Sequence, residues 1–234
     1  MRRSIALLVA LVLALIPFTS LAADPVTTTT VAEKKVDSVP AGANAWCIKD
    51  YPDKSAAQAA AGNYGLVAEV GGKVWLATLG TGSGQCAATV GPLTMPNAGQ
   101  YLIRVMELKG PSGGQTAVHM HPGSESYYVL AGSMKVQSDS GTKSASAGQA
   151  LVGPGAGTAM QVTSTGSQDV QALALFVVDA SQAFSTPTEF HAGHTVAPQT
   201  GAGHMGSPVV GLLTAIAAAA VFGLGIALRR LRHA

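Results

Sequence analysis

Two histidines and one glutamate lie close enough in the sequence to form a metal site. One residue separates His119 from His121, and Glu125 follows four positions later. On a strand, alternate side chains point to the same side, so the two imidazoles are expected to face together. Pro122-Gly123 predicts a turn, after which Glu125 would open the next strand and face the same interior. Two imidazoles and a carboxylate suit a first-row divalent metal and leave positions open for water or a ligand.

The segments around these residues predict an all-β fold. Short β-branched and apolar runs alternate with Gly and Pro turns, which is typical of a small closed or sandwich-like barrel. Hairpins are expected at Gly71-Gly72 and at Ala131-Gly132, and only residues 54–61 look helical. Residues 170–178 are almost wholly apolar, which favours a small or hydrophobic ligand. The expected strands are 65–70, 73–78, 101–108, 115–121, 126–130, 133–137, 149–152, 159–163 and 170–178.

The spacing of the glycines around the histidines matches a known motif. Gly113, His119, His121, Glu125 and Gly132 occupy every fixed position of G-x5-H-x-H-x3-E-x6-G. This pattern resembles the first motif of the cupin superfamily. The resemblance implies a single jelly-roll type β-barrel over residues 101–182, with the metal inside the barrel mouth. Residues 46–100 lie outside it and are expected to add strands or a flap to the barrel.

The second motif of that family, G-x5-P-x-G-x2-H-x3-N, is matched only in part. Gly148 and Pro154 fit one register, which puts Ala159 where the family has its histidine ligand. A register shifted by one residue puts Met160 there and is the better fit. A thioether suits Cu(I) better than Fe, Mn or Zn, but Met also fills gaps in cores, so ligation and packing both remain open. The expected cofactor is one divalent metal ion (Fe, Mn, Zn, Ni or Cu), with a metal-free barrel as the alternative.

The remaining chemistry-bearing residues are expected to have structural roles. Cys47 and Cys86 are the only two cysteines, and in an oxidising compartment such a pair predicts a disulfide rather than free thiols. His191-Ala192-Gly193-His194 has H-x-x-H spacing, with His204 nearby, but these histidines lie in a Gly/Pro-rich stretch that fixes no geometry. Glu107 is expected to be an ordinary strand residue.

The two ends of the chain predict export and anchoring. Residues 1–23 combine a basic start, a short apolar run and small residues, which is typical of a signal peptide cleaved after Ala22 or Ala23. An uncleaved anchor helix is the alternative. Residues 209–228 carry no charge and are long enough for a transmembrane helix, rather than a buried core helix. The basic tail, 229–234, would stay in the cytoplasm and leave the rest of the chain outside the cell membrane.

Two linkers are expected to connect the barrel domain to these ends. Residues 24–45 are rich in Thr, Pro, Ala and Val and predict an extracellular linker, and residues 183–208 predict a second, Gly/Pro/Thr-rich one. Within the second, Ala197-Pro198-Gln199-Thr200-Gly201 resembles the L-P-x-T-G signal for cell-wall sorting, except at its first position. Processing by a sortase between Thr200 and Gly201 would remove the helix, whereas a plain membrane anchor would keep it.

Composition narrows the class of function. Only 11% of the residues are charged, the net charge is +2, and no basic stripe is present that would suit nucleic acid. The sequence has no nucleophile–base motif and no phosphate-binding loop, so any catalysis would run through the metal. Three hypotheses follow: a metal- or ligand-binding cupin module, a metal-dependent dioxygenase or isomerase acting on a small molecule, and a metal-free structural envelope protein. A homodimer is compatible with each of them.

Overall fold

The computed structural model describes residues 24–80 and 85–191, and strands dominate this part of the chain, as predicted. The strands form three sheets. Helix α2 (Lys54–Ala60) confirms the short helix expected there, and Asp53 caps its first turn by accepting a hydrogen bond from the Ala56 N–H. The strands are β1 (Thr27–Val36), β2 (Trp46–Tyr51), β3 (Gly65–Val70), β4 (Lys73–Leu79), β5 (Ala88–Val90), β6 (Tyr101–Gly110), β7 (His119–Met120), β8 (Gly123–Ala131), β9 (Ser133–Ser138), β10 (Gly141–Ser146), β11 (Ala150–Val152), β12 (Met160–Thr165), β13 (Val170–Asp179) and β14 (Thr186–Pro187).

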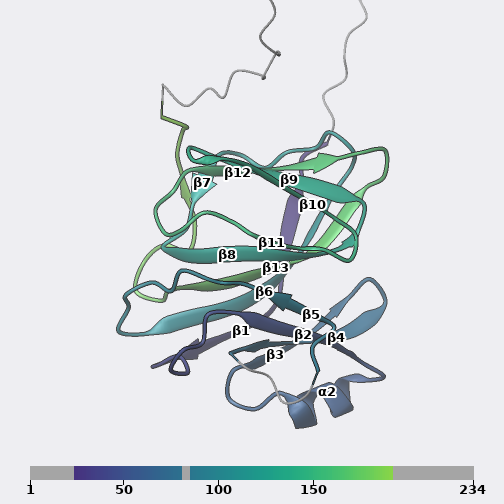
Figure 1. Ribbon diagram of the computed structural model, residues 1–234, viewed down its shortest axis with the longest axis vertical. Coiled ribbons are helices and arrows are strands. Elements are labelled where there is room, and N and C mark those ends of the chain that lie inside the picture. Colours follow the sequence, from purple (N-terminus) through teal and green to yellow (C-terminus); the bar gives the residue numbers. More distant parts are fainter. Residues whose placement is uncertain (1–23, 81–84, 192–234) are drawn as a thin grey trace, which may run out of the picture. The chain divides into compact units, whose positions relative to one another are not determined.

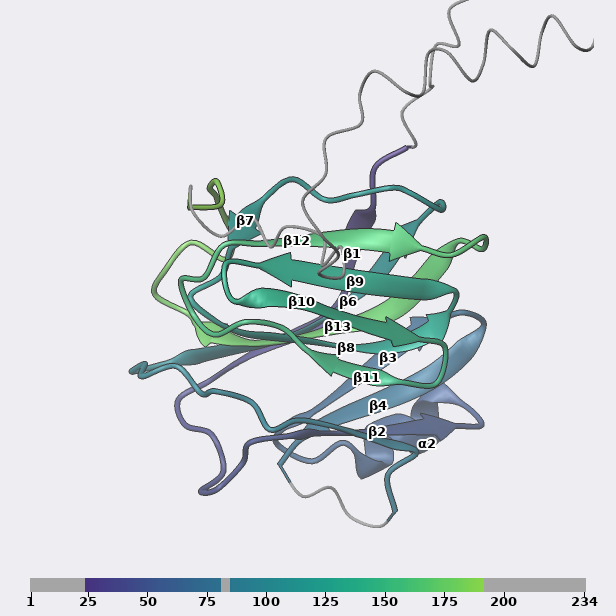
Figure 2. The same cartoon turned by 45° about the horizontal axis from the view of Figure 1, so that its top comes forward.

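Two five-stranded sheets face each other and form the barrel. One has the order β1-β6-β13-β8-β11, and the other has the order β10-β9-β12-β7-β14. Figure 1 shows them as the upper two layers, and Figure 2 shows β12, β9 and β10 side by side above the other sheet. This arrangement confirms the jelly-roll type barrel that the first motif implied. Its core lies between the two sheets and includes Leu108, Tyr127, Val129, Met134, Val136, Val162, Ala174 and Phe176.

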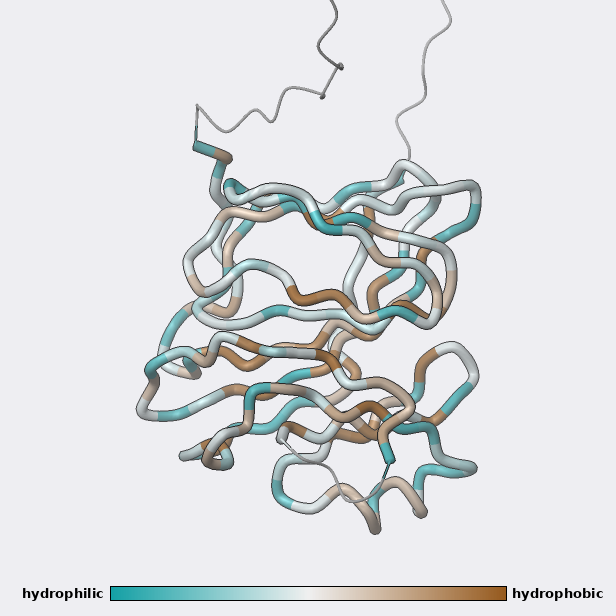
Figure 3. The backbone as a smooth tube through the Cα atoms, viewed as in Figure 1, coloured by the Kyte–Doolittle hydropathy of each residue, from teal (hydrophilic) through white to brown (hydrophobic). Residues whose placement is uncertain are grey.

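A third sheet, β3-β4-β2-β5, packs on the outside of the barrel and forms a second core. It corresponds to the expected extension over residues 46–100. The disulfide predicted between Cys47 and Cys86 is present and ties β2 to the segment before β5. In Figure 3, hydrophobic stretches run along the middle layer and along the strands next to it. The second core contains Trp46, Ile48, Leu66, Trp75, Ile103, Val105, Leu173, Leu175 and Val177.

The apolar strand β13 is buried on both faces because it belongs to this middle layer. Its alternate residues Ala172, Ala174 and Phe176 face the barrel core. Leu173 and Leu175, between them, face the third sheet. The interpretation of this strand as evidence for a hydrophobic ligand therefore applies to only one of its faces, since the other face packs against protein.

The expected linker over residues 24–45 is wrong for the part that forms β1. This ten-residue strand pairs antiparallel with β6 over its whole length, with an irregularity between Thr30 and Ala32. Most of its side chains are exposed, so its sequence shows no alternation of apolar and polar residues. Its backbone hydrogen bonds at the edge of the middle sheet hold it in place instead.

The two predicted hairpins have different outcomes. Gly71 and Gly72 both have positive φ angles and join β3 to β4, as expected. The second hairpin is wrong, because β9 pairs with β10 and β12 and not with β8. At Gly132, whose φ is +66°, the chain leaves one barrel sheet and enters the other. A Cβ at this position would lie 2.4 Å from the carbonyl oxygen of Asp169, so the corner requires glycine.

Several expectations concern residues outside the described part of the chain. These are the signal peptide (1–23), His194, His204, the sorting-like motif (197–201), the transmembrane helix (209–228) and the basic tail (229–234). Within residues 24–80 and 85–191, no helix is both long and apolar enough to cross a membrane.

Candidate metal centre

The three expected ligands come from a short strand, the turn after it and the next strand. Residues 115–121 do not form one long strand: only β7, which holds His119, is regular, and Gln115 makes an isolated bridge to Thr163. His121 directly follows β7, and Glu125 lies on β8. Since β7 pairs with β12 and β8 pairs with β13, the imidazoles and the carboxylate approach each other across the barrel interior.

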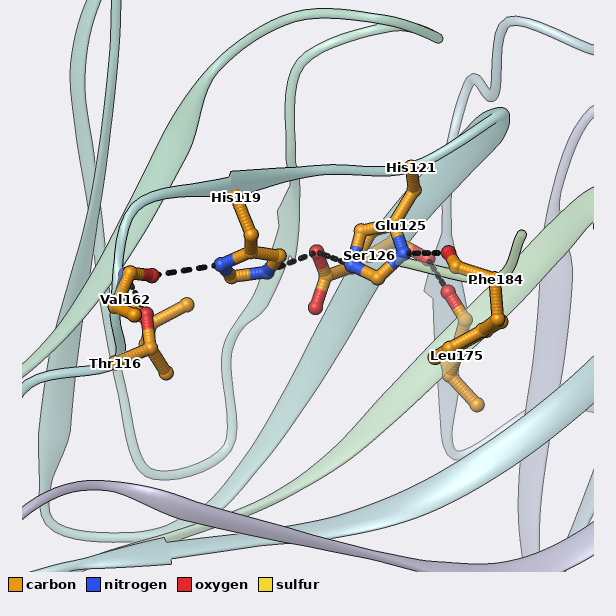
Figure 4. Close-up of polar contacts among 9 residues, drawn as sticks. Thr116, His119, His121, Glu125, Ser126, Val162, Leu175 and Phe184 are labelled. Atoms are coloured by element: carbon orange, nitrogen blue, oxygen red, sulfur yellow. Dashed lines mark hydrogen bonds and ion pairs between the residues drawn. The ribbon is translucent and has the colours of Figure 1, made fainter. Parts of the chain in front are cut away.

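Their side chains converge as the sequence predicted. The Nε2 atom of His121 lies 3.3 Å from Oε2 of Glu125, and Nε2 of His119 lies 4.0 Å from the same oxygen. The three ligand atoms all lie within 4.8 Å of one another. Figure 4 shows both rings directed at the carboxylate, one from each side. A single ion placed among these atoms could contact all three.

Backbone carbonyls determine which nitrogen of each ring carries hydrogen. Nδ1 of His119 lies 2.8 Å from the carbonyl oxygen of Ala117, and Nδ1 of His121 lies 2.6 Å from that of Phe184. A carbonyl only accepts, so each Nδ1 must donate, and in the neutral ring each Nε2 presents a lone pair. These lone pairs point toward Glu125. A hydrogen bond from a ligand imidazole to a backbone carbonyl is a common way to orient metal-binding histidines.

This arrangement is electrostatically incomplete without a cation. Glu125 is buried, and its Oε2 atom has no hydrogen-bond partner among the described residues, although Nε2 of His121 approaches it to 3.3 Å. A buried carboxylate that faces two lone pairs is unfavourable unless a proton or a metal ion lies between them. The donor set and the unsatisfied oxygen therefore fit a divalent metal.

A proton would compete with a metal ion for the position between the Glu125 carboxylate and the two imidazoles. Burial lowers the pKa of His121, but the adjacent Glu125 carboxylate and the Phe184 carbonyl outweigh burial, and the net effect raises the pKa above 6.5. Tyr127, on the same face of β8 as Glu125, is also wholly buried. Burial, reinforced by the Glu125 carboxylate, raises the pKa of the Tyr127 phenol well above its usual value, so this hydroxyl stays neutral.

An aromatic cluster surrounds His121. Its ring packs against Phe176 of β13 at 5.0 Å and against Phe184 at 4.9 Å, measured between ring centroids. Phe184 lies in the region expected to be a linker (183–208), but β14 in that region pairs with β7 and brings Phe184 to the site. The sequence analysis missed Phe184. An aromatic residue shortly after a buried strand, in an otherwise Gly/Pro-rich stretch, was the available signal.

A cavity of about 440 Å³ adjoins the three ligands. Most of its wall is apolar and comes from β6, β12, β13 and the segment before β1. Arg104 of β6 also lines it and was missed, because nothing in the local sequence distinguishes it from a surface arginine. The apolar wall residues include Val26, Met106, Leu108, Val162, Phe176 and Phe184.

Met160, the better candidate for the fourth ligand position, lies opposite His119 in the pairing of β12 with β7. Met160 is buried and belongs to the barrel core, while Val162, two positions along the same strand, lines the cavity. Ala159, the other candidate position, is buried just before β12. This position is compatible with packing, and ligation by the Met160 sulfur stays a prediction.

The other residues that the sequence singled out lie away from the site. Glu107 accepts a hydrogen bond from Gln171 at 2.6 Å and pairs with Lys109 at 3.0 Å, as an ordinary strand residue. His191 is exposed, and its Nδ1 atom lies 2.6 Å from a carboxylate oxygen of Asp139. Neither joins the cluster of three ligands.

Comparison with known families identifies the barrel. The family model of the cupin domain matches residues 106–177. This part of the chain is a cupin domain. The matched span runs from β6 to β13 and includes His119, His121 and Glu125, so the cupin domain contains the whole candidate centre.

Several solved structures are similar to part of this chain. A conserved protein of unknown function from Streptococcus pyogenes has 23% identity and a TM-score of 0.30, over 33% of this chain and 64% of its own. The DMSP lyase DddQ from Ruegeria pomeroyi has 23% identity and a TM-score of 0.32, over 37% and 43%. A double-stranded β-helix protein from Klebsiella pneumoniae has 17% identity and a TM-score of 0.33, over 42% and 77%. This chain thus spans less than two thirds of the first two proteins. No curated protein is significantly similar to it in sequence.

Proposed function

We propose that this protein is an exported, envelope-anchored cupin-domain protein that binds a divalent metal and a small ligand inside its barrel. His119, His121 and Glu125 would hold the metal. The observation that carries the proposal is the convergence of two imidazole lone pairs on a buried carboxylate oxygen that has no hydrogen-bond partner among the described residues. The adjoining cavity offers the ligand a place next to the metal.

The residues of the chain would act by positioning and by excluding water. The carbonyls of Ala117 and Phe184 keep each Nε2 atom free of hydrogen and aimed inward. The aromatic rings of Phe176 and Phe184 shield one side of His121 from solvent. A bound divalent metal would supply a Lewis acid with coordination positions open to a ligand.

Binding is favoured over catalysis because the cavity lacks an obvious general base. Its titratable wall residues, apart from the three metal ligands, are limited to Arg104 among the residues the structure describes. An arginine stays protonated in proteins and is suited to holding a ligand rather than to moving a proton. We therefore place capture of a small ligand first and metal-dependent catalysis second.

Metal content after reloading tests the metal site. The full chain, purified in mild detergent, is stripped with a chelator, reloaded separately with Fe(II), Mn, Zn, Ni or Cu, desalted and analysed by mass spectrometry for metal. Wild type should retain about one equivalent of at least one metal, and His119→Ala and Glu125→Ala should each retain at least tenfold less, since removal of one of three ligands leaves a buried site incomplete. His191→Ala, which alters an exposed histidine outside the cluster, is the matched control.

The same measurement decides the role of Met160. If Met160 only packs in the core, Met160→Leu should retain the wild-type metal content, because the two side chains have similar volume. Preferred binding of copper that disappears in Met160→Leu would support ligation by the thioether instead. Wild type that holds no more metal than Glu125→Ala under any condition would overturn the proposed metal function.

A further inference from the structure

We infer that the ligand bound next to the metal is a small organic anion with an apolar body, held at its charged end by Arg104. This inference rests on the proposed function and names the class of ligand for the same site. It depends on the position of Arg104, on its contacts with Glu33 and Phe184, and on the apolar remainder of the cavity.

Arg104 reaches the cavity with part of its hydrogen-bonding capacity unused. Its side chain is 17% exposed and lines the cavity wall. Nε and Nη2 both lie near one oxygen of Glu33 on β1, at 2.8 Å and 2.6 Å. Nη1 has no partner among the residues that the structure describes, so a guanidinium with five N–H donors retains donors for a ligand oxygen.

Phe184 places this arginine next to the metal centre. The guanidinium carbon lies 3.9 Å from the centroid of the Phe184 ring, in cation–π contact. The ring of His121 packs against the same phenyl group, with centroids 4.9 Å apart. Arg104 and His121 therefore both contact Phe184 and line the same cavity, so a ligand there would meet the guanidinium as well as the metal.

The balance of charge in the cavity favours an anion. A divalent ion held by two neutral imidazoles and the Glu125 carboxylate keeps one uncompensated positive charge. The Glu33 side chain is 49% exposed, so water screens its charge, whereas Arg104 lies largely in the protein interior. An anionic ligand would neutralise the excess charge of the metal site and accept hydrogen bonds from the remaining donors of Arg104, whereas a neutral apolar ligand would do neither.

The remaining wall of the cavity limits which organic group can be attached to the anion. Val26, Met106 and Leu108 contribute apolar surface on one side, and Val162 and Phe176 contribute it nearer the metal. The volume of about 440 Å³ falls within the range of roughly 300–1,000 Å³ typical of small-molecule sites. The chemistry that fits is a carboxylate on a short aliphatic or aromatic body.

Calorimetric titration of the metal-loaded full chain tests this inference. The probes are phenylacetate and the straight-chain carboxylates from acetate to octanoate, each compared with its neutral amide. At least one carboxylate with an apolar body should bind, and at least tenfold more tightly than its amide. Arg104→Gln should weaken carboxylate binding at least tenfold while the metal content stays at the wild-type level.

Glu33→Gln should change the affinity for carboxylates in the direction opposite to that of Arg104→Gln. This change removes the carboxylate charge that competes for Arg104, so carboxylate binding should become several-fold tighter, an outcome that a damaged fold would not produce. The inference is overturned if amides bind as tightly as carboxylates, if fully metallated Arg104→Gln keeps wild-type affinity, or if no carboxylate binds the metallated protein. Those results leave the metal site standing. A wild type that takes up no metal contradicts the proposed function itself and removes the inference with it.

Discussion

At the residue scale, His121 is the most constrained member of the candidate centre. Its Nδ1 donates to the Phe184 carbonyl, its Nε2 faces Glu125, and Phe176 and Phe184 pack against its ring. His119 has a comparable backbone hydrogen bond but lies on the more exposed side of the cluster. Proton binding and metal binding should therefore compete at His121 in a way that stability measurements detect.

The stability of the metal-free protein should fall as pH rises past the raised pKa of His121. In the folded chain this pKa lies above the ordinary value of 6.5, so protonated His121 stabilises the fold. That contribution is fully present below about pH 6.5, and it is lost as pH rises through the folded-state pKa. Thermal unfolding of chelator-treated protein, measured from about pH 5 to pH 9, should show a decline of Tm over this window that His121→Gln reduces.

Adding metal should reverse this dependence of stability on pH. A metal binds the neutral imidazole and releases its proton, so the gain in Tm on adding metal should grow as pH rises over the same range. A metal-induced gain that shrinks with rising pH, or that persists unchanged in His121→Gln, would contradict the assignment of His121 as a ligand.

At the scale of elements, the connections between the two barrel sheets bring the ligands together. The corner at Gly132 sends the chain from β8, which carries Glu125, to β9 in the opposite sheet. Gly132 has a φ of +66°, and Gly148 has a φ of +82° before β11. They share the left-handed conformation but differ in their surroundings, since a Cβ at Gly148 would meet nothing within 4 Å.

This difference predicts unequal costs for the same substitution. Gly148→Ala should lower the free energy of unfolding by about 1–2 kcal/mol, the cost of left-handed backbone for a residue with a Cβ. Gly132→Ala should cost at least about 1 kcal/mol more, because its Cβ would lie 2.4 Å from the Asp169 carbonyl oxygen and force the corner to move. Urea denaturation of both variants provides the comparison. Equal losses would show that the corner adapts and that close packing there is unimportant.

At the scale of the whole molecule, the described domain has three layers and one disulfide, and β13 in the middle sheet is buried on both faces. A disulfide in a domain of this kind is in keeping with folding in an oxidising compartment, as the proposed export requires. Two contacts lie just after the expected cleavage point: the Val26 N–H donates to the Gln115 carbonyl, and Pro25 lines the cavity. Loss of residues 1–23 would leave these contacts intact.

Export therefore predicts a processed N-terminus. The mature protein, isolated from the membrane fraction of the cells that produce it and analysed by mass spectrometry, should begin at Ala23 or Asp24. Its C-terminus distinguishes the two anchors: an intact Ala234 indicates a retained helix, and an end at Thr200 indicates sortase processing. A chain that keeps Met1 and fractionates with cytoplasmic proteins would contradict the proposed export.

The sequence by itself determined the local parts of this protein. The alternation of His119 and His121, the position of Glu125 after a turn and the spacing of five motif residues were sufficient to predict the barrel and the three convergent side chains. The two cysteines were sufficient to predict the disulfide. The three side chains were predictable because they lie close together in the sequence, the barrel because the motif resembles that of a known family, and the disulfide because the chain has only two cysteines.

Only the tertiary structure decided the parts that depend on distant segments. The exposed strand β1 is held by its pairing with β6, β9 joins the sheet opposite β8, and β13 is apolar because a third sheet covers its outer face. Arg104 and Phe184 meet in the cavity although 80 positions separate them. The pairing of β14 with β7 brings Phe184 to this part of the barrel. No local sequence pattern predicts such contacts, because they depend on packing between elements that are far apart in the sequence.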